Sequence, residues 1–169
     1  MALQVVVMGV SGCGKSTVGQ HLAQVLGASF IEGDSFHPPA NVARMAAGTP
    51  LTDDDRQGWL DTLAALLASA GRESRSVVLA CSALKRRYRD TLRRGAPDLH
   101  FVHLQGGRAQ FAARLAARQG HYMPASLLDS QLATLEMPGA DERALTLDID
   151  TPCETLVQLA LAHLKPTPP

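Results

Sequence analysis

No charge of either sign is in excess in this sequence, because its 16 basic and 16 acidic side chains cancel over 169 residues. A balanced surface argues against polyanionic partners, so we expect neither nucleic acid nor a membrane surface to bind. The sequence also lacks an apolar stretch long enough to span a bilayer, and it lacks a basic leader with a cleavage site. These absences predict a soluble protein of the cytoplasm.

Cysteine is scarce as well. Cys13, Cys81 and Cys153 are odd in number and far apart, without a C-x-x-C pair, which is typical of reduced thiols and not of a disulfide framework. His100 and His103 are three residues apart on a predicted strand and therefore point to opposite faces of it. They cannot hold one metal together, and the sequence shows no zinc-site pattern.

A phosphate-binding motif is present near the N-terminus. The segment Gly9-Val10-Ser11-Gly12-Cys13-Gly14-Lys15-Ser16 matches G-x-x-x-x-G-K-[ST], and it directly follows the apolar run 3–8. Glycines let successive backbone N–H groups converge on an anion, and the positive end of the following helix adds to that attraction. We expect Lys15 to reach the β- and γ-phosphates of a nucleoside triphosphate, and Ser16 to ligate Mg²⁺.

Strand-like runs recur along the chain and alternate with helical segments. The runs span Leu3–Met8, Ser29–Glu32, Val77–Cys81, His100–Leu104 and Leu145–Ile149. This alternation predicts an α/β fold in three layers, a sandwich with a central five-stranded parallel sheet covered by helices on both faces. The length fits a single domain over residues 1–169.

Local signals predict where several helices begin and end. The first helix is expected over 15–26, with Gly27 as the residue that ends it. Thr52 and Asp55 have capping-box spacing, which predicts the start of a long helix. The pair Thr151-Pro152 is predicted to supply the N-cap and first residue of the last helix.

Two segments are predicted to be insertions, which belong neither to the strands nor to the helices that cover the sheet. Residues 37–58 contain Pro38-Pro39, a short helix predicted near 42–47 and a turn, while residues 118–126 interrupt an alanine-rich helical stretch. Ligands bind at the carboxyl ends of the strands in such sheets. We therefore expect the first insertion to cover a phosphoryl acceptor and the second to act as a lid over the nucleotide.

A carboxylate at the end of the second strand is the leading candidate for proton transfer. Glu32-Gly33-Asp34 lies at the same sheet edge as the phosphate loop, and we favour Asp34 to accept the acceptor hydroxyl's proton or to hold Mg²⁺ through water. The third strand ends in Cys81-Ser82, where many phosphate-loop ATPases carry a metal-binding aspartate. The missing aspartate argues against a generic ATPase or motor and leaves the acidic role to Asp34.

Several cations are candidate ligands for the phosphates or the acceptor. Arg114 and Arg118 share one helix face ahead of the lid, where a guanidinium would stabilise charge on the transferring group; a surface pair is the alternative. Lys85 either neutralises an anionic acceptor or is a solvated member of a basic run. Trp59 is expected in the core, with the floor of a sugar site as the second reading. The candidates for a polar acceptor in the two insertions are His37, Arg44, Arg56 and His121.

Further blocks of sequence accompany the phosphate loop. They are Gly33-Asp34 with His37-Pro38 and Asn41, then Met45 with 48–56 and Trp59, then 81–85 with Tyr88-Arg89, then 118–121, and finally 138–142. Together these blocks resemble, nearly end to end, the small phosphate-loop gluconokinases, which are related in fold to shikimate and adenylate kinases. The phosphate loop is shared by many unrelated enzymes, whereas the middle blocks are specific to this family.

The resemblance implies ATP-dependent phosphorylation of D-gluconate at its terminal hydroxyl to give 6-phospho-D-gluconate, by a cytoplasmic homodimer. It implies that residues 9–17 hold ATP and Mg²⁺, that Asp34 faces the acceptor hydroxyl, and that the segments around Arg56, Lys85 and Arg89 border the sugar acid. Gluconate ends in a carboxylate, and the guanidinium fork of Arg56 is the first choice to bind it.

Alternatives remain within and outside this reading. A kinase of the same fold could act on shikimate, a nucleoside monophosphate or adenylylsulfate, and an ATP-binding regulatory module would bind without turnover. A GTP-driven switch is disfavoured, because the single asparagine, Asn41, precedes Val42 and cannot begin the N-K-x-D guanine-binding motif.

Overall fold

The computed structural model describes residues 2–117 and 125–165. Their strands form one five-stranded parallel sheet in the order β2-β3-β1-β4-β5. The strands are β1 (Gln4–Met8), β2 (Ser29–Glu32), β3 (Val77–Ala80), β4 (His100–Gln105) and β5 (Ala144–Asp148). The predicted strands and the three-layer α/β fold are confirmed, with each strand end within one residue of its predicted place.

The central position of β1 explains its composition. It pairs with β3 on one side and β4 on the other, so that Val6 lies between Leu79 and Phe101. All three side chains are buried, as expected for a parallel strand covered on both faces. The edge strands β2 and β5 are only partly buried.

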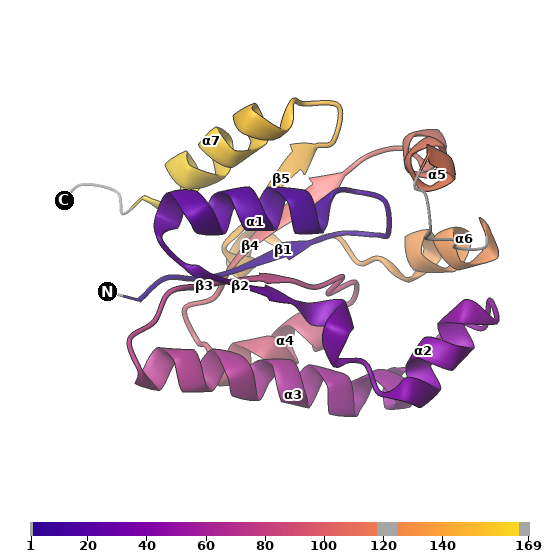
Figure 1. The fold of residues 1–169 in the computed structure, drawn as a ribbon, viewed down its shortest axis with the longest axis horizontal. Coiled ribbons are helices and arrows are strands. Elements are labelled where there is room, and N and C mark those ends of the chain that lie inside the picture. Colours follow the sequence, from indigo (N-terminus) through magenta and orange to yellow (C-terminus); the bar gives the residue numbers. More distant parts are fainter. Residues whose placement is uncertain (1, 118–124, 166–169) are drawn as a thin grey trace.

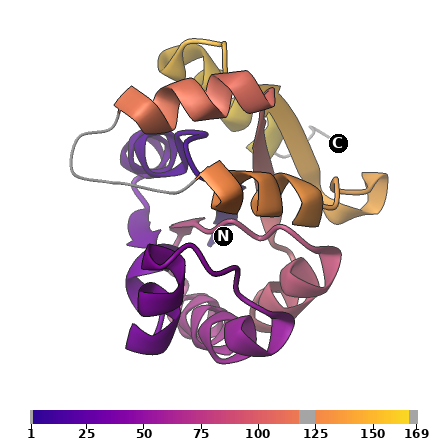
Figure 2. The same cartoon turned by 90° about the vertical axis from the view of Figure 1, so that its right-hand side faces the viewer.

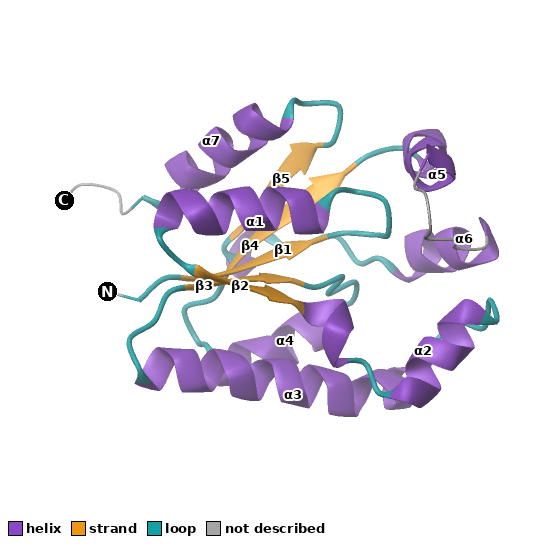
Figure 3. Cartoon of the chain, in the orientation of Figure 1, coloured by secondary structure: helices purple, strands orange, loops and turns teal. Residues whose placement is uncertain are grey.

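Helices form the two outer layers. Their bounds are α1 (Lys15–Leu26), α2 (Pro39–Ala46), α3 (Asp53–Arg72), α4 (Arg86–Gly95), α5 (Arg108–Ala117), α6 (Ala125–Thr134) and α7 (Cys153–Leu164), with 3₁₀ turns η1 (Gly33–Phe36) and η2 (Ala140–Glu142). The helices α1 and α7 cover one face of the sheet, and α3 and α4 cover the other (Figures 1 and 3). In the turned view of Figure 2, α2, α5 and α6 face the viewer. They gather at the carboxyl ends of the strands.

Three of the predicted helix boundaries are confirmed. The first helix spans 15–26, and Gly27 ends it in a left-handed conformation with φ 65°. Thr52 and Asp55 form the capping box, in which the Asp55 N–H donates to Thr52 Oγ1 over 3.1 Å and the Thr52 N–H donates to Asp55 Oδ2 over 2.9 Å.

Two other helix starts were misplaced. The last helix begins one residue later than predicted, with Pro152 as its N-cap. The reason is that Asp148 holds the preceding residues in a turn, where its carbonyl accepts from the Thr151 N–H over 3.1 Å. The short helix α2 begins at Pro39, earlier than predicted, because a proline is pre-set for the first helical position. Among the described residues, no helix has the length and apolar character required to cross a bilayer.

Candidate active site

The phosphate loop, residues 9–16, joins the central strand β1 to α1 at the carboxyl edge of the sheet. Gly14 is the N-cap of α1 in a left-handed conformation (φ 90°), and no side chain caps the helix there. The first-turn amides of α1 therefore lack partners within the helix, and the positive end of its dipole faces the same space. This is the geometry of an anion-binding helix terminus.

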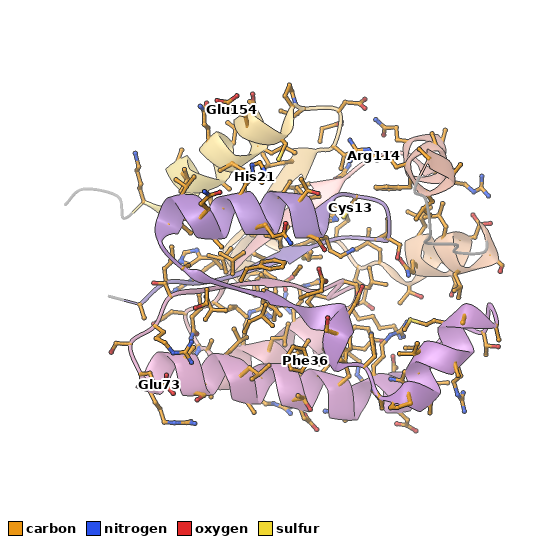
Figure 4. All side chains as sticks on the ribbon, viewed as in Figure 1. Cys13, His21, Phe36, Glu73, Arg114 and Glu154 are labelled. Carbon is orange, nitrogen blue, oxygen red and sulfur yellow. The ribbon has the colours of Figure 1, made fainter. Side chains whose placement is uncertain are left out.

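A cavity adjoins the loop, and we call it the phosphate cavity. Its lining residues are Ser11, Gly12, Gly14, Lys15, Ser16, Thr17, Asp34 and Arg114. Arg114 reaches it from α5 and donates to the Cys13 carbonyl over 3.4 Å and to the Ile149 carbonyl over 2.6 Å. Figure 4 shows Cys13 and Arg114 at the same end of the molecule. Cys13 as a whole is only 1% exposed and is not part of the cavity lining, so its thiol does not face a ligand there.

Oxygen donors suited to Mg²⁺ lie at the edge of this cavity. The Ser16 hydroxyl donates to the Glu32 carboxylate at the end of β2, and Asp34 follows two residues later in η1. Gly33 between them is required by space, since a Cβ there would meet the Ala80 carbonyl oxygen at 2.4 Å. A hydroxyl and carboxylates are the hard ligands that Mg²⁺ prefers, so these residues fit the ion. In the described part of the chain, no group of three His, Cys, Asp or Glu side chains could hold a metal alone.

The residue after β3, where many phosphate-loop ATPases carry a metal-binding aspartate, cannot take over the role of that aspartate. Cys81 occupies the place, and burial raises the pKa of its thiol to about 12. A neutral thiol gives no negative charge to the site at neutral pH. Glu32, which accepts from Ser16, and Asp34, which lines the phosphate cavity, remain as carboxylates beside the loop.

A second cavity, the acceptor cavity, adjoins the first. It is lined by Ser11, Lys15, Asp34, His37, Met45, Leu51, Arg56, Trp59, Ser82, Leu84 and Gln131. Ser11, Lys15 and Asp34 line both cavities. A group bound in one cavity thus meets a group bound in the other at these three residues.

An imidazole and an indole form one wall of the acceptor cavity. The rings of His37 and Trp59 stack with centroids 4.0 Å apart, and Trp59 Nε1 donates to the Gly33 carbonyl over 2.8 Å. Trp59 is buried, as predicted for a core residue, and it also lines the cavity. Burial lowers the pKa of His37, and the cation of Arg56 adds to this effect, although Asp34 opposes it. A neutral His37 can donate or accept a hydrogen bond.

Arg56 enters the same cavity from α3 and is held by neighbours. Its Nη1 donates to the Leu51 carbonyl over 2.8 Å and to the Tyr88 hydroxyl over 2.9 Å. Tyr88 in turn donates to Asp53. Burial, with help from the bond to Asp53, raises the pKa of Tyr88 to about 12, so the phenol stays neutral. The guanidinium of Arg56 is thereby oriented without a carboxylate partner among the described residues.

The prediction that Arg89 borders the acceptor was wrong. Its side chain is 0% exposed and forms a bidentate pair with Glu142, with Nε 2.7 Å from Oε1 and Nη2 3.2 Å from Oε2. Its remaining nitrogen donates to the carbonyls of Ala83 and Leu84. Arg89 thus supports the loop after β3 from behind, and that loop supplies Ser82 and Leu84 to the acceptor cavity.

Two other predicted acceptor residues lie beside the cavity and not in its lining. Arg44 is half exposed on α2 and pairs with Asp55 at 3.2 Å. Lys85 pairs with Asp53 at 3.1 Å. The predicted residues Arg118 and His121 lie outside the described residues, as does most of the predicted lid.

The structure adds site residues that sequence reasoning missed. Glu32 was named in the segment Glu32-Gly33-Asp34 at the end of β2, but Asp34 was preferred to it. Gln131 comes from α6 and had no local signal, because nothing in its neighbourhood marks it as facing the phosphate loop. Its Oε1 accepts from the Ser11 N–H over 2.8 Å.

A larger cavity, of about 710 Å³, lies at the opposite edge of the sheet, where Gln4 and His100 begin β1 and β4. Ligands of open parallel sheets bind at the carboxyl ends of the strands, and this cavity lies at the amino ends. It contains none of the predicted site residues. We therefore place the active site at the phosphate loop.

The fold and the site together define a P-loop kinase, in which a phosphate cradle opens onto a separate polar acceptor cavity. The family described as "AAA domain" matches residues 5–138. Gluconokinase from Gluconobacter oxydans is 47% identical over 95% of this chain and 90% of its own, and thermoresistant gluconokinase from Escherichia coli is 44% identical over 95% and 92%. The crystal structure of a gluconokinase from Sinorhizobium meliloti superposes with a TM-score of 0.87 at 50% identity, covering 96% of this chain and 91% of that one. The chain belongs to the gluconokinase family.

Proposed function

We propose that this enzyme transfers the γ-phosphoryl group of ATP to the terminal hydroxyl of D-gluconate, giving ADP and 6-phospho-D-gluconate. One observation carries the proposal: the phosphate and acceptor cavities meet at Ser11, Lys15 and Asp34. A phosphoryl group held by the loop and a hydroxyl held in the acceptor cavity approach each other there. Phosphoryl transfer needs mainly such alignment and positive charge around the transferring group.

The nucleotide is assigned to residues 9–17, whose backbone amides and Lys15 bind its phosphates. Ser16 and Asp34, with Glu32, are the groups that would hold Mg²⁺, directly or through water. When bound, the ion neutralises charge on the β- and γ-phosphates. Arg114 borders the same phosphates, and Arg118 is proposed to join it from the lid.

The acceptor is assigned to the second cavity. Arg56 is proposed to bind the gluconate carboxylate, since its guanidinium is oriented by Leu51 and Tyr88, and its Nε and Nη2 donate to no group in the described part of the chain. His37 offers a neutral hydrogen-bonding group to the polyol. Asp34 is proposed to accept the proton of the reacting hydroxyl. Arg44, Lys85 and His121 are retained as groups bordering the sugar acid at longer range.

The proposal also covers the domain organisation, the oligomeric state and the cellular location of the enzyme. We propose a single kinase domain over residues 1–169, with an acceptor-binding insertion at 37–58 and a lid at 118–126. We also propose a cytoplasmic homodimer. Size-exclusion chromatography with light scattering measures the assembly directly, and a monomer at micromolar concentration would contradict it.

A coupled ADP-release assay tests the reaction. D-Gluconate, shikimate, a nucleoside monophosphate and adenylylsulfate are compared as acceptors at equal concentration with MgATP. We expect the highest kcat/KM with gluconate and no turnover in the Lys15→Ala variant. Preference for another acceptor would replace the substrate assignment, and binding of MgATP without turnover of any acceptor would indicate a regulatory module.

A further inference from the structure

Gln131 connects α6 to the phosphate loop through both polar atoms of its side chain. Its Oε1 accepts from the Ser11 N–H over 2.8 Å, and its Nε2 donates to the Ser11 hydroxyl over 3.1 Å. The two residues are 120 positions apart in the sequence. Two bonds to one residue fix the plane of the amide, so its position relative to the loop is set.

The helix that carries Gln131 is itself anchored. Near its middle, Asp129 accepts from Arg108 of α5 over 2.5 and 3.2 Å, and the neighbouring Leu128 is buried in the core. Just beyond its end, the Glu136 N–H donates to the Leu84 carbonyl over 2.7 Å. The amide of Gln131 is therefore held from the helix side as well as from the loop side.

The amide of Gln131 has unused hydrogen-bonding capacity. A glutamine side chain offers two N–H donors and a carbonyl oxygen with two lone pairs. Ser11 takes one N–H and one lone pair. One donor and one acceptor remain without a partner among residues 2–117 and 125–165, and Gln131 is part of the lining of the acceptor cavity.

We propose that Gln131 is an acceptor-binding residue, which uses its remaining donor and acceptor to hold hydroxyl groups of the sugar acid. The inference rests on the proposed function. Each hydroxyl of a polyol both donates and accepts, so two adjacent hydroxyls match the pair of groups that Gln131 presents. Because Gln131 is bound to Ser11, which lines both cavities, these are the hydroxyls next to the one that receives the phosphoryl group. Gln131 thereby fixes which carbon of the polyol lies next to the phosphate loop.

Steady-state kinetics of a Gln131→Met variant test the inference. Methionine keeps the length of the side chain and removes its hydrogen bonds. We expect kcat/KM for gluconate to fall about 10-fold or more, since two hydrogen bonds to a neutral ligand are lost. We expect the KM for ATP to change less than about 2-fold. The matched control is Thr134→Ala on the same helix, whose hydroxyl, as far as the structure describes the chain, bonds to the Ser130 carbonyl of α6 alone; this variant should leave both constants unchanged.

A series of monodeoxy-D-gluconates distinguishes contact from support of the loop. For each analogue, kcat/KM of the unsubstituted enzyme is divided by kcat/KM of Gln131→Met. If Gln131 binds the hydroxyl at position 4 or 5, this ratio should approach one for the analogue that lacks that hydroxyl, because the variant then has no contact left to lose. A ratio that is the same for every analogue, or an equal loss of ATP and gluconate affinity, would overturn the assignment and leave Gln131 as a support of Ser11.

Three further outcomes are distinguishable. If the methionine variant does not fold, Gln131→Glu repeats the comparison, because its carboxylate still accepts the Ser11 N–H and lacks both amide donors. Absence of gluconate turnover by the unsubstituted enzyme would overturn the proposed function itself. Normal turnover with an unchanged gluconate KM in both variants would overturn only the role of Gln131.

Discussion

The buried pair of Arg89 and Glu142 provides the sharpest test of the structure that does not depend on the substrate. The two side chains are 0% and 1% exposed. Glu142 also accepts from Arg93 over 2.5 Å and from the Gly139 N–H over 2.7 Å. These bonds lower the pKa of Glu142 to about 2 although burial acts in the opposite direction, so the carboxylate is charged at neutral pH.

Replacing Arg89 by methionine leaves a buried carboxylate short of its main partner and removes the donor to the carbonyls of Ala83 and Leu84. Removing one member of a buried pair costs about 3–5 kcal/mol, because the remaining charge stays desolvated. In a protein of this size about 1 kcal/mol corresponds to about 2–4 °C in Tm, so we expect Tm to fall by roughly 6–20 °C. The Glu142→Gln variant should also be destabilised, because Arg89 then lacks its counter-charge.

Urea and thermal unfolding of both variants measure the effect. The matched control is Arg75→Met, which removes an arginine from the exposed pair with Glu73 and should cost less than about 1 kcal/mol. A loss below about 1 kcal/mol for Arg89→Met would refute the reasoning from burial. Unchanged stability together with weakened gluconate binding would instead restore Arg89 to the acceptor site.

Three further predictions concern the site and the core. Asp34→Asn should keep the KM for ATP and lower kcat by about 100-fold or more, with the exposed Asp54→Asn as control; turnover near that of the unsubstituted enzyme would reject proton transfer by Asp34. Arg56→Ala should raise the KM for gluconate more than that for ATP, whereas Arg44→Ala should change it little; an unchanged gluconate KM in Arg56→Ala removes this residue from the carboxylate site. Burial, with a smaller effect from the nearby Arg89 cation, lowers the pKa of His103 from 6.5 to about 4. Between pH 6.5 and pH 4, His103 is therefore protonated in the unfolded chain and neutral in the folded protein. The unfolding free energy should accordingly fall by about 3 kcal/mol as pH drops from 6.5 to 4. Denaturant titrations at several pH values measure this slope, which His103→Gln should flatten; equal slopes would contradict it.

The elements of the fold were predictable where the chain carries its own local signal. Strand β1 is a run of buried β-branched residues, α1 ends at a glycine, and the capping box at Thr52 starts α3. Each depends on interactions within a few residues. The start of α7 was misplaced because a turn at Asp148 competes with the cap expected at Thr151.

The arginines show where prediction from local sequence signals fails. Arg56 and Arg89 both stand within blocks specific to the family, and both were assigned to the acceptor. Only the packing distinguishes them, since Arg56 reaches the cavity while Arg89 points into the core toward Glu142, 53 residues further along. Gln131 illustrates the converse, a residue without local pattern that the fold brings against the phosphate loop.

Motif spacing and hydrophobic periodicity alone were sufficient for the phosphate loop, the five parallel strands and the sheet edge at which ligands bind, because these properties arise from neighbouring residues. The strand order with β1 at the centre, the joining of two cavities at Ser11, Lys15 and Asp34, and the division of arginines between core and site became apparent only in three dimensions. They depend on contacts between residues far apart in the chain, for which a single sequence holds no periodic signal.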